Sequence, residues 1–105
     1  MAQFTLYRNT NQQTQGRYPF LLDVQNDFLD ALKTRLVVPA IKQSEQKPVT
    51  RLNPVFEFEQ QQYLLVVQEM AAIPVNNLGA KVTEMEALRG EILAALPHYQ
   101  KKLYF

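Results

Sequence analysis

The chain has 105 residues and a formal net charge of +1, and 47% of its residues are hydrophobic. That length suits one domain spanning residues 1–105, and the near-neutral charge excludes a general electrostatic attraction to nucleic acid or anionic lipid. The sequence contains no cysteine, which excludes disulfides, thiolate nucleophiles and Cys-based metal sites.

No segment of the sequence points to a membrane or to secretion. The N-terminal MAQFTLYRNT has no basic segment followed by an apolar run, unlike a secretory signal. The longest apolar stretches, such as LLVV at 64–67, are far shorter than the roughly 20 residues that a membrane-spanning helix needs. The expected location is therefore the reducing cytoplasm, without membrane contact.

The N-terminal part predicts a series of short strands. Apolar and polar side chains alternate in QFTLYR (3–8), which is typical of a strand with one buried face. YPFLLDVQ (18–25) has its proline near the start, where a missing N–H donor is tolerated. TRLVVPA (34–40) predicts a short strand that Pro39 closes. The connecting segments are expected to be a loop at 9–16, turns at 26–32 and a second loop at 42–50.

The middle of the chain predicts a hairpin. PVFEFEQ (54–60) alternates strictly, with its phenylalanines on one face and its glutamates on the other. QYLLVVQE (62–69) is apolar on both faces, as expected of a strand inside a sheet or barrel. The glutamines at 60–61 favour a tight connection between these strands. AAIPVNNLG (71–79) follows, with a proline and the turn signal Asn76–Asn77.

One amphipathic helix is expected near the C-terminus. Thr83 and Glu86 have capping-box spacing, in which hydroxyl and carboxylate satisfy backbone donors reciprocally. Pro97 should end or kink the helix, because its ring opposes an earlier backbone carbonyl. Apolar residues recur at helical spacing at Met85, Leu88, Ile92, Ala95 and Leu96. Short strands followed by one helix predict an α+β, mainly β fold: a small barrel or bent sheet with the helix packed on it.

The residues that carry chemistry are few. Asp23, Asp27 and Asp30 lie close in sequence, but they lack the alternating acids and closing glutamate of a calcium loop. Aspartates in such a stretch commonly form turns through bonds to their own backbone, so turn chemistry is favoured over catalysis. His98 has no serine, cysteine or carboxylate at motif spacing, and interaction with the last helix carbonyls is the favoured role.

The arginines are scattered along the sequence, so single surface positions are favoured over a phosphate site. Taken by themselves, the residues predict no catalytic group, no metal and no cofactor, and they favour function by binding. The arginines concerned are Arg8, Arg17, Arg35, Arg51 and Arg89.

Several segments, in order along the chain, resemble the CcdB toxins of bacterial toxin–antitoxin modules. They are QFTLY at 3–7, RYPFLLDVQNDFLD at 17–30, TRLVVPA at 34–40 and EMAAIPVNNLG at 69–79. The resemblance covers nearly the full length and is interrupted mainly at the 9–16 and 42–50 loops. It implies an SH3-like barrel of short antiparallel strands with a C-terminal helix, assembled as a homodimer.

The resemblance also implies partners. The first is a CcdA-like antitoxin, whose disordered C-terminal arm wraps the toxin and whose N-terminal part binds operator DNA, so that the toxin meets DNA only indirectly. The second is DNA gyrase, because such toxins bind the DNA-cleaving subunit of this enzyme and trap the complex with cleaved DNA. They use no catalytic residues of their own.

The C-terminal tail departs from the pattern of gyrase-poisoning members, which end in a Trp-Gly-Ile that contacts gyrase. This sequence contains no tryptophan, and a gapless register from Ile92 places lysine, lysine and leucine at the corresponding positions 101–103. An exposed aromatic end can still anchor a partner. By position, the candidate target-binding residues are Lys101, Lys102, Leu103, Tyr104 and Phe105.

Two other functions are alternatives to that of a gyrase-binding toxin. A non-toxic homologue that only binds an antitoxin and modulates operator binding would account for the altered tail. An endoribonuclease toxin is the enzymatic alternative, because RNA-cleaving toxins of the MazF and Kid kind share the SH3-like barrel. It would need Arg35, Arg51 and an aspartate to converge on a scissile phosphate, and fold analogy alone does not carry function.

Overall fold

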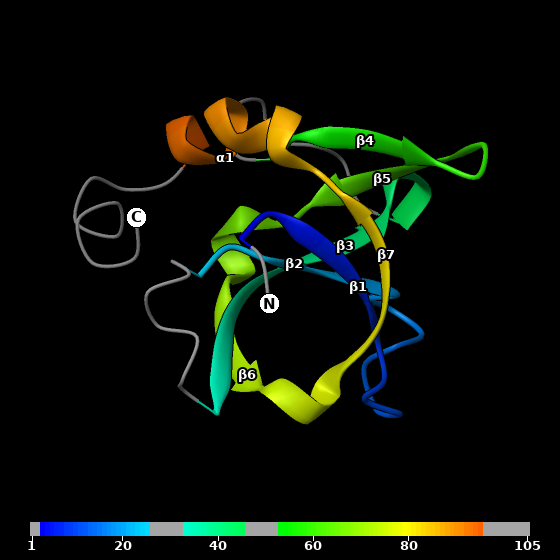
Figure 1. Ribbon diagram of the computed structural model, residues 1–105. Helices are drawn as coiled ribbons and strands as arrows, with labels where there is room; N and C mark the ends of the chain where they lie inside the picture. Colours follow the sequence, from blue (N-terminus) through cyan, green and yellow to red (C-terminus); the bar gives the residue numbers. More distant parts are fainter. Residues whose placement is uncertain (1–2, 26–32, 46–52, 96–105) are drawn as a thin grey trace.

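A curved, seven-stranded antiparallel sheet forms most of the structure (Figure 1). The computed structural model describes residues 3–25, 33–45 and 53–95. Hydrogen-bonded neighbours follow the order β4–β5–β3–β2–β1–β7, and β6 also pairs with β3. The strands are β1 (Thr5–Asn9), β2 (Phe20–Asp23), β3 (Thr34–Lys42), β4 (Val55–Phe58), β5 (Gln61–Leu65), β6 (Ala71–Pro74) and β7 (Leu78–Glu84). The prediction of an α+β, mainly β fold is confirmed as a half-barrel with one C-terminal helix.

The strands β1 and β2 confirm the first predictions from sequence. They pair antiparallel with Leu6 opposite Leu22, and both side chains are fully buried. The polar segment after β1 forms turns, which include the backbone bond from Tyr18 N to Thr14 O at 2.8 Å. The turns predicted at 26–32 lie outside the described residues.

The strand β3 is longer than predicted, because Pro39 lies inside it and does not close it. Its N-terminal half pairs with β6 as far as Val37, and its C-terminal end pairs with β5 from Ala40. Pro39 falls between these two partners, where its missing N–H leaves no ladder bond unmade. Its carbonyl still accepts a bond from Val66 N at 2.8 Å.

The β4–β5 hairpin has the predicted strands with a connection shifted by one residue. Phe58 pairs with Gln61, so the loop is Glu59–Gln60, not 60–61. Both loop residues have positive φ, 50° and 66°, as a two-residue hairpin turn that follows the strand twist requires. The predicted alternation is confirmed in β4, where Phe56 is buried and Glu57 exposed.

The stretch after β5 divides into shorter elements than predicted. The strand ends at Leu65, and a 3-10 turn, η3 (Val67–Glu69), leads into β6. The turn expected at Asn76–Asn77 is confirmed as η4 (Val75–Asn77), a 3-10 turn between β6 and β7. The strand β7 was not expected from the sequence, and its pairing with β1 is interrupted by register shifts.

The C-terminal helix begins later than its predicted capping box. Thr83 belongs to β7 and pairs with Leu6, so it does not cap a helix. A 3-10 turn, η5 (Glu86–Leu88), precedes α1 (Arg89–Ala95). The apolar stripe is confirmed, because Ile92 and Ala95 are buried and the earlier members are partly buried against the same core. Leu96 and Pro97 lie outside the described residues.

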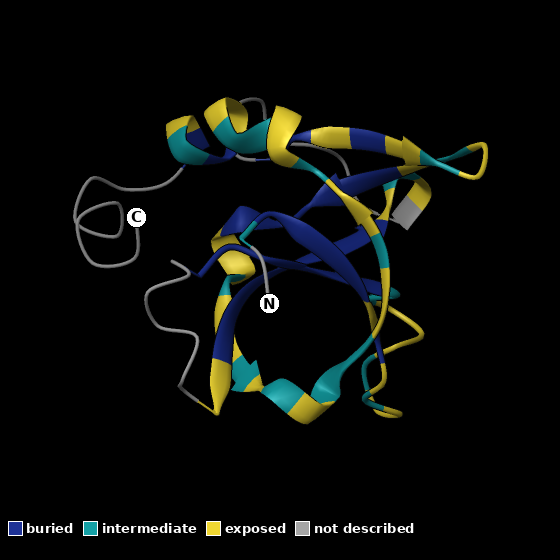
Figure 2. Cartoon of the chain, in the orientation of Figure 1, coloured by how far each residue is buried: buried dark blue, intermediate teal, exposed yellow. Residues whose placement is uncertain are grey.

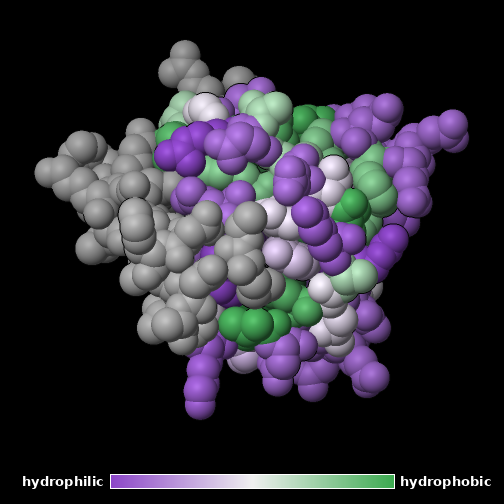
Figure 3. Space-filling model, in the orientation of Figure 1, coloured by the Kyte–Doolittle hydropathy of each residue, from purple (hydrophilic) through white to green (hydrophobic). Residues whose placement is uncertain are grey.

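The main core lies between α1 and one face of the sheet (Figure 2). Its aromatic side chains contact one another, with Phe20 edge-on to Tyr63 at 5.1 Å between ring centroids. The surface seen in Figure 3 is largely hydrophilic, and Val55 is the one large hydrophobic residue that is exposed in the described part of the chain. Among the fully buried members of this core are Phe4, Leu6, Leu22, Val24, Val38, Leu65 and Ile92.

Gly79 marks a close approach between β7 and the end of β1. We expect Gly79→Ala to lower the free energy of unfolding by about 1–3 kcal/mol, as overpacking does. The added Cβ would lie 2.7 Å from Thr10 Cγ2 and 3.1 Å from Arg8 O. The urea-unfolding midpoint measures the loss.

The matched control is Gly16→Ala, since nothing lies within 4 Å of a Cβ there; its change should stay within about 0.5 kcal/mol. Adding Thr10→Ser to Gly79→Ala removes the clashing methyl but keeps the hydroxyl that donates to Asn77 O at 3.0 Å. The double variant should recover part of the loss. Equal losses in both glycine variants would contradict the close approach.

Candidate functional site

The predicted target-binding residues Lys101, Lys102, Leu103, Tyr104 and Phe105 lie outside the described residues, as does His98. Their roles stay predictions. The described residues instead contain a buried ionic network and an open pocket. Both lie on the sheet face opposite the helix.

An ion pair is buried between β2 and β3 on that face. Arg35 Nε donates to Asp23 Oδ2 at 2.9 Å, and Arg35 Nη2 donates to Asp23 Oδ1 at 3.0 Å. The side chains are 1% and 0% exposed. Such a two-point contact matches the planar guanidinium to the carboxylate and is stronger than a single bond. The pair therefore holds the two strands in a fixed register.

Gln25 extends this network along the backbone. Its N–H donates to Asp23 Oδ1 at 3.0 Å, an Asx-type bond that confirms the turn role predicted for Asp23. Its side-chain Oε1 accepts from Leu36 N at 2.8 Å. The DVQ segment and the RLVVP segment are thus joined by side-chain and backbone bonds. Asp27 and Asp30 lie outside the described residues.

Arg35 corrects the prediction that the arginines occupy surface positions. Its side chain is the largest fully buried one among the residues that the structure describes, whereas Arg8 and Arg17 are exposed. Sequence reasoning missed it because a strand places successive side chains on opposite faces, and only the paired strands show which face is enclosed. A signal was present: Arg35 directly precedes an apolar run, where an unpaired charge would be costly.

The same burial removes Arg35 from the endoribonuclease hypothesis. Its guanidinium bonds to Asp23 and to Gln25 O, the latter at 3.4 Å, and it is closed to solvent. A scissile phosphate in solution therefore has no access to it. Arg51, the other arginine of that hypothesis, lies outside the described residues.

Tyr7 is also buried on this face, and the charges of the ionic network affect the pKa of its phenol. Burial raises the pKa of its phenol above the ordinary 10.0, and the nearby Asp23 carboxylate raises that pKa further. The positive charges of Arg35 and Lys81 act in the opposite direction. The phenol is therefore held neutral.

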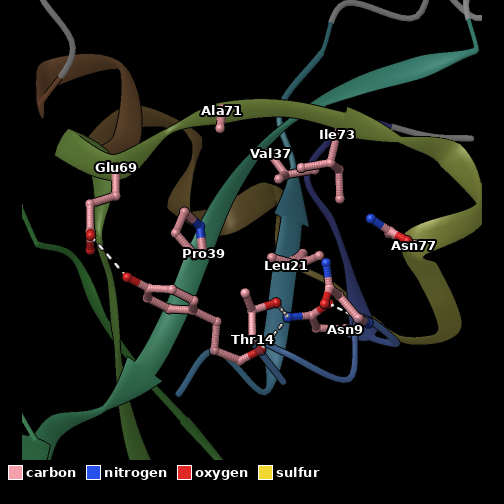
Figure 4. Close-up of a pocket in the computed structure, with 11 residues that line it drawn as sticks. Asn9, Thr14, Leu21, Val37, Pro39, Glu69, Ala71, Ile73 and Asn77 are labelled. Atoms are coloured by element: carbon pink, nitrogen blue, oxygen red, sulfur yellow. Dashed lines mark hydrogen bonds between the residues drawn. The ribbon is translucent and has the colours of Figure 1, made fainter. Parts of the chain in front are cut away.

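An open pocket of about 230 Å³ lies between β6, β3 and the β1–β2 loop (Figure 4). Leu21, Val37 and Pro39 contribute apolar side chains from β2 and β3. Glu69 and Asn77 lie at opposite ends in Figure 4. The pocket is therefore apolar between two polar ends.

Hydrogen bonds hold the pocket walls in place. Buried Asn9 donates through Nδ2 to Thr14 Oγ1 at 3.0 Å and to Tyr18 O at 2.9 Å. Tyr18 donates its hydroxyl to Glu69 Oε1 at 2.9 Å, which ties the β1–β2 loop to η3. Thr10 N donates to Asn77 O at 3.1 Å and ties the other side to η4.

Residues 3–25, 33–45 and 53–95 contain no group of three or more His, Cys, Asp or Glu side chains placed to hold a metal ion. Within the same part of the chain, no helix has the length and apolar character needed to cross a membrane.

Comparison with models of protein families shows which family the chain belongs to. The family model described as CcdB protein matches residues 3–99. The chain belongs to the CcdB family. The match includes the DVQ and RLVVP segments, with the buried Asp23–Arg35 pair that joins them, and it ends before residue 101. CcdB family proteins are non-enzymatic gyrase poisons, which agrees with the expectation that this chain is not an enzyme.

Because the Asp23–Arg35 pair is buried, a substitution that hardly changes the shape of the side chain should still lower the stability of the protein strongly. Asp23→Asn should lower the free energy of unfolding by about 3–5 kcal/mol, because it leaves the Arg35 guanidinium buried without a carboxylate. Thermal or urea unfolding measures this loss. The control is Glu84→Gln in the exposed Lys81–Glu84 pair (3.1 Å), which should cost less than about 1 kcal/mol. Similar losses in both variants would contradict a dominant role for the buried pair.

The raised pKa of Tyr7 predicts that the stability of the fold depends on pH. The folded state holds the phenol proton more tightly than the unfolded chain, whose pKa is near 10.0. Its contribution to stability is therefore complete below that pH and is lost as pH rises through the folded pKa. Unfolding free energies between about pH 8 and 11 should fall less steeply in Tyr7→Phe than in the wild type. Parallel curves would contradict the raised pKa.

Proposed function

We propose that this protein is the toxin of a CcdA/CcdB-type toxin–antitoxin module and acts in the cytoplasm as one domain. The family match over residues 3–99 carries the proposal. The bonded DVQ and RLVVP segments support it, because these segments carried the resemblance to the toxins. The proposed neutralising partner is a CcdA-like antitoxin, which links the toxin to operator DNA.

The finer proposal is that the toxin, as a homodimer, binds the DNA-cleaving subunit of DNA gyrase and traps the enzyme on cleaved DNA. Inhibition of this kind requires a contact surface and no catalytic group. By position, the contact is assigned to Lys101, Lys102, Leu103, Tyr104 and Phe105.

The tail itself favours a second candidate, a non-toxic homologue that binds an antitoxin and modulates operator binding. The sequence contains no tryptophan, and lysines stand at 101 and 102 where gyrase-poisoning members have tryptophan and glycine. Ammonium groups are strongly hydrated and do not replace an aromatic side chain in an apolar contact.

Incubation of the purified protein with gyrase, ATP and plasmid DNA tests the target. The expected result is linear DNA after protein denaturation, together with growth arrest when the chain is expressed in gyrase-sensitive bacteria. Deletion of residues 101–105 should abolish both effects while the unfolding midpoint stays unchanged.

A variant with Trp-Gly-Ile at 101–103 and a stop after it separates the two candidates. Cleavage by this variant but not by the wild type would reject gyrase poisoning and leave the antitoxin-binding homologue. Co-purification with the product of an adjacent short reading frame then measures antitoxin binding directly. Failure of both proteins to cleave DNA or to bind that product would reject the toxin–antitoxin assignment.

A further inference from the structure

The toxin function proposed above assigns no role to the pocket beneath β6. This pocket lies on the sheet face opposite α1, and its lining differs from one end to the other (Figure 4). A carboxylate lies at one end, side-chain amides lie at the other, and the floor between them is apolar. Each of these parts restricts what the pocket binds.

The floor accepts an aliphatic chain. Leu21, Val37 and Pro39 meet Ala71 and Ile73 of β6 around a space of about 230 Å³. That volume is below the roughly 300–1,000 Å³ of pockets for whole small-molecule ligands. It suits one long side chain.

Glu69 determines which sign of ligand charge the pocket attracts. It is the only charged residue among the described residues that line the pocket. Its Oε1 accepts from the Tyr18 hydroxyl at 2.9 Å, and its Oε2 has no bond to any other described residue. The guanidinium of Arg17 lies over the Tyr18 ring at 5.4 Å, and Arg17 does not line the pocket. The open end therefore favours a cation and opposes an anion.

The opposite end offers groups that pair with a peptide bond. Asn77 and Asn11 line the pocket, and neither the Asn77 side-chain amide nor Asn11 Nδ2 makes a hydrogen bond to another described residue. A primary amide both donates and accepts, which matches the N–H and C=O of an extended backbone.

We propose that this pocket binds a lysine or arginine side chain of an extended segment of a partner protein. The methylene stem lies along Val37 and Pro39, as long basic side chains commonly lie on apolar surface. The charged group reaches Glu69, and the adjoining peptide group bonds to Asn77. This inference rests on the pocket alone and does not depend on gyrase binding.

Three capped amino acids test the inference on the full-length protein by amide NMR titration: the N-acetyl, N-methylamide forms of lysine, norleucine and glutamate. The lysine probe should shift the amides of Leu21, Val37, Glu69 and Ile73 in a saturable way. It should bind about two- to fivefold more tightly than norleucine, the range expected of a partly exposed ion pair. The glutamate probe should give no saturable shifts at these amides.

Glu69→Gln keeps an acceptor for the Tyr18 hydroxyl but removes the charge, so it should abolish the preference for lysine over norleucine. Glu57→Gln is the matched control, since Glu57 is exposed on β4 and bonds to Gln62 Nε2 at 3.1 Å. It should leave the preference unchanged. Equal binding of lysine and glutamate probes, shifts elsewhere on the surface, or a preference that survives Glu69→Gln would overturn the proposal.

Discussion

The bidentate ion pair between Asp23 and Arg35 is the constraint on which one whole face of the sheet depends. Neither charge is tolerable alone at 0–1% exposure, because an unpaired buried ion loses its hydration without compensation. Only the paired arrangement of β2 and β3 satisfies both. Gln25 then fixes the backbone beyond the pair through bonds to Asp23 and to Leu36. The register of these strands is therefore specified by polar as well as apolar contacts.

The two faces of the sheet hold different features. One face is closed by α1 over a hydrophobic core that includes Ile92 and Ala95. The other face holds the ion pair at one place and an open pocket at another. The core and the ion pair lie within the family match over residues 3–99, whereas the proposed gyrase contact lies after residue 100.

Sequence periodicity predicted local structure well where one face of an element meets solvent. Phe56 and Glu57 alternate in burial as expected, and the stripe through Leu88 and Ile92 does face the core. Periodicity failed where two elements compete for the same residues. Thr83 and Glu86 have the spacing of a helix cap, yet Thr83 bonds into the sheet beside Leu6. Pairing with the N-terminal strand β1 outweighed the local preference of Thr83 and Glu86 for capping a helix.

The sequence by itself determined the fold class, the order of the main elements and, through its segments, the family. Those properties follow from side-chain alternation, apolar spacing and residues in fixed order, all of which are local. Tertiary structure alone decided that Arg35 is buried, that Pro39 lies between the segments of β3 that pair with β6 and with β5, and that Glu69 meets Tyr18 at one end of a pocket. These contacts join residues separated by up to 51 positions. Strand pairing brings such residues together, and no local pattern of side chains encodes which of them will meet.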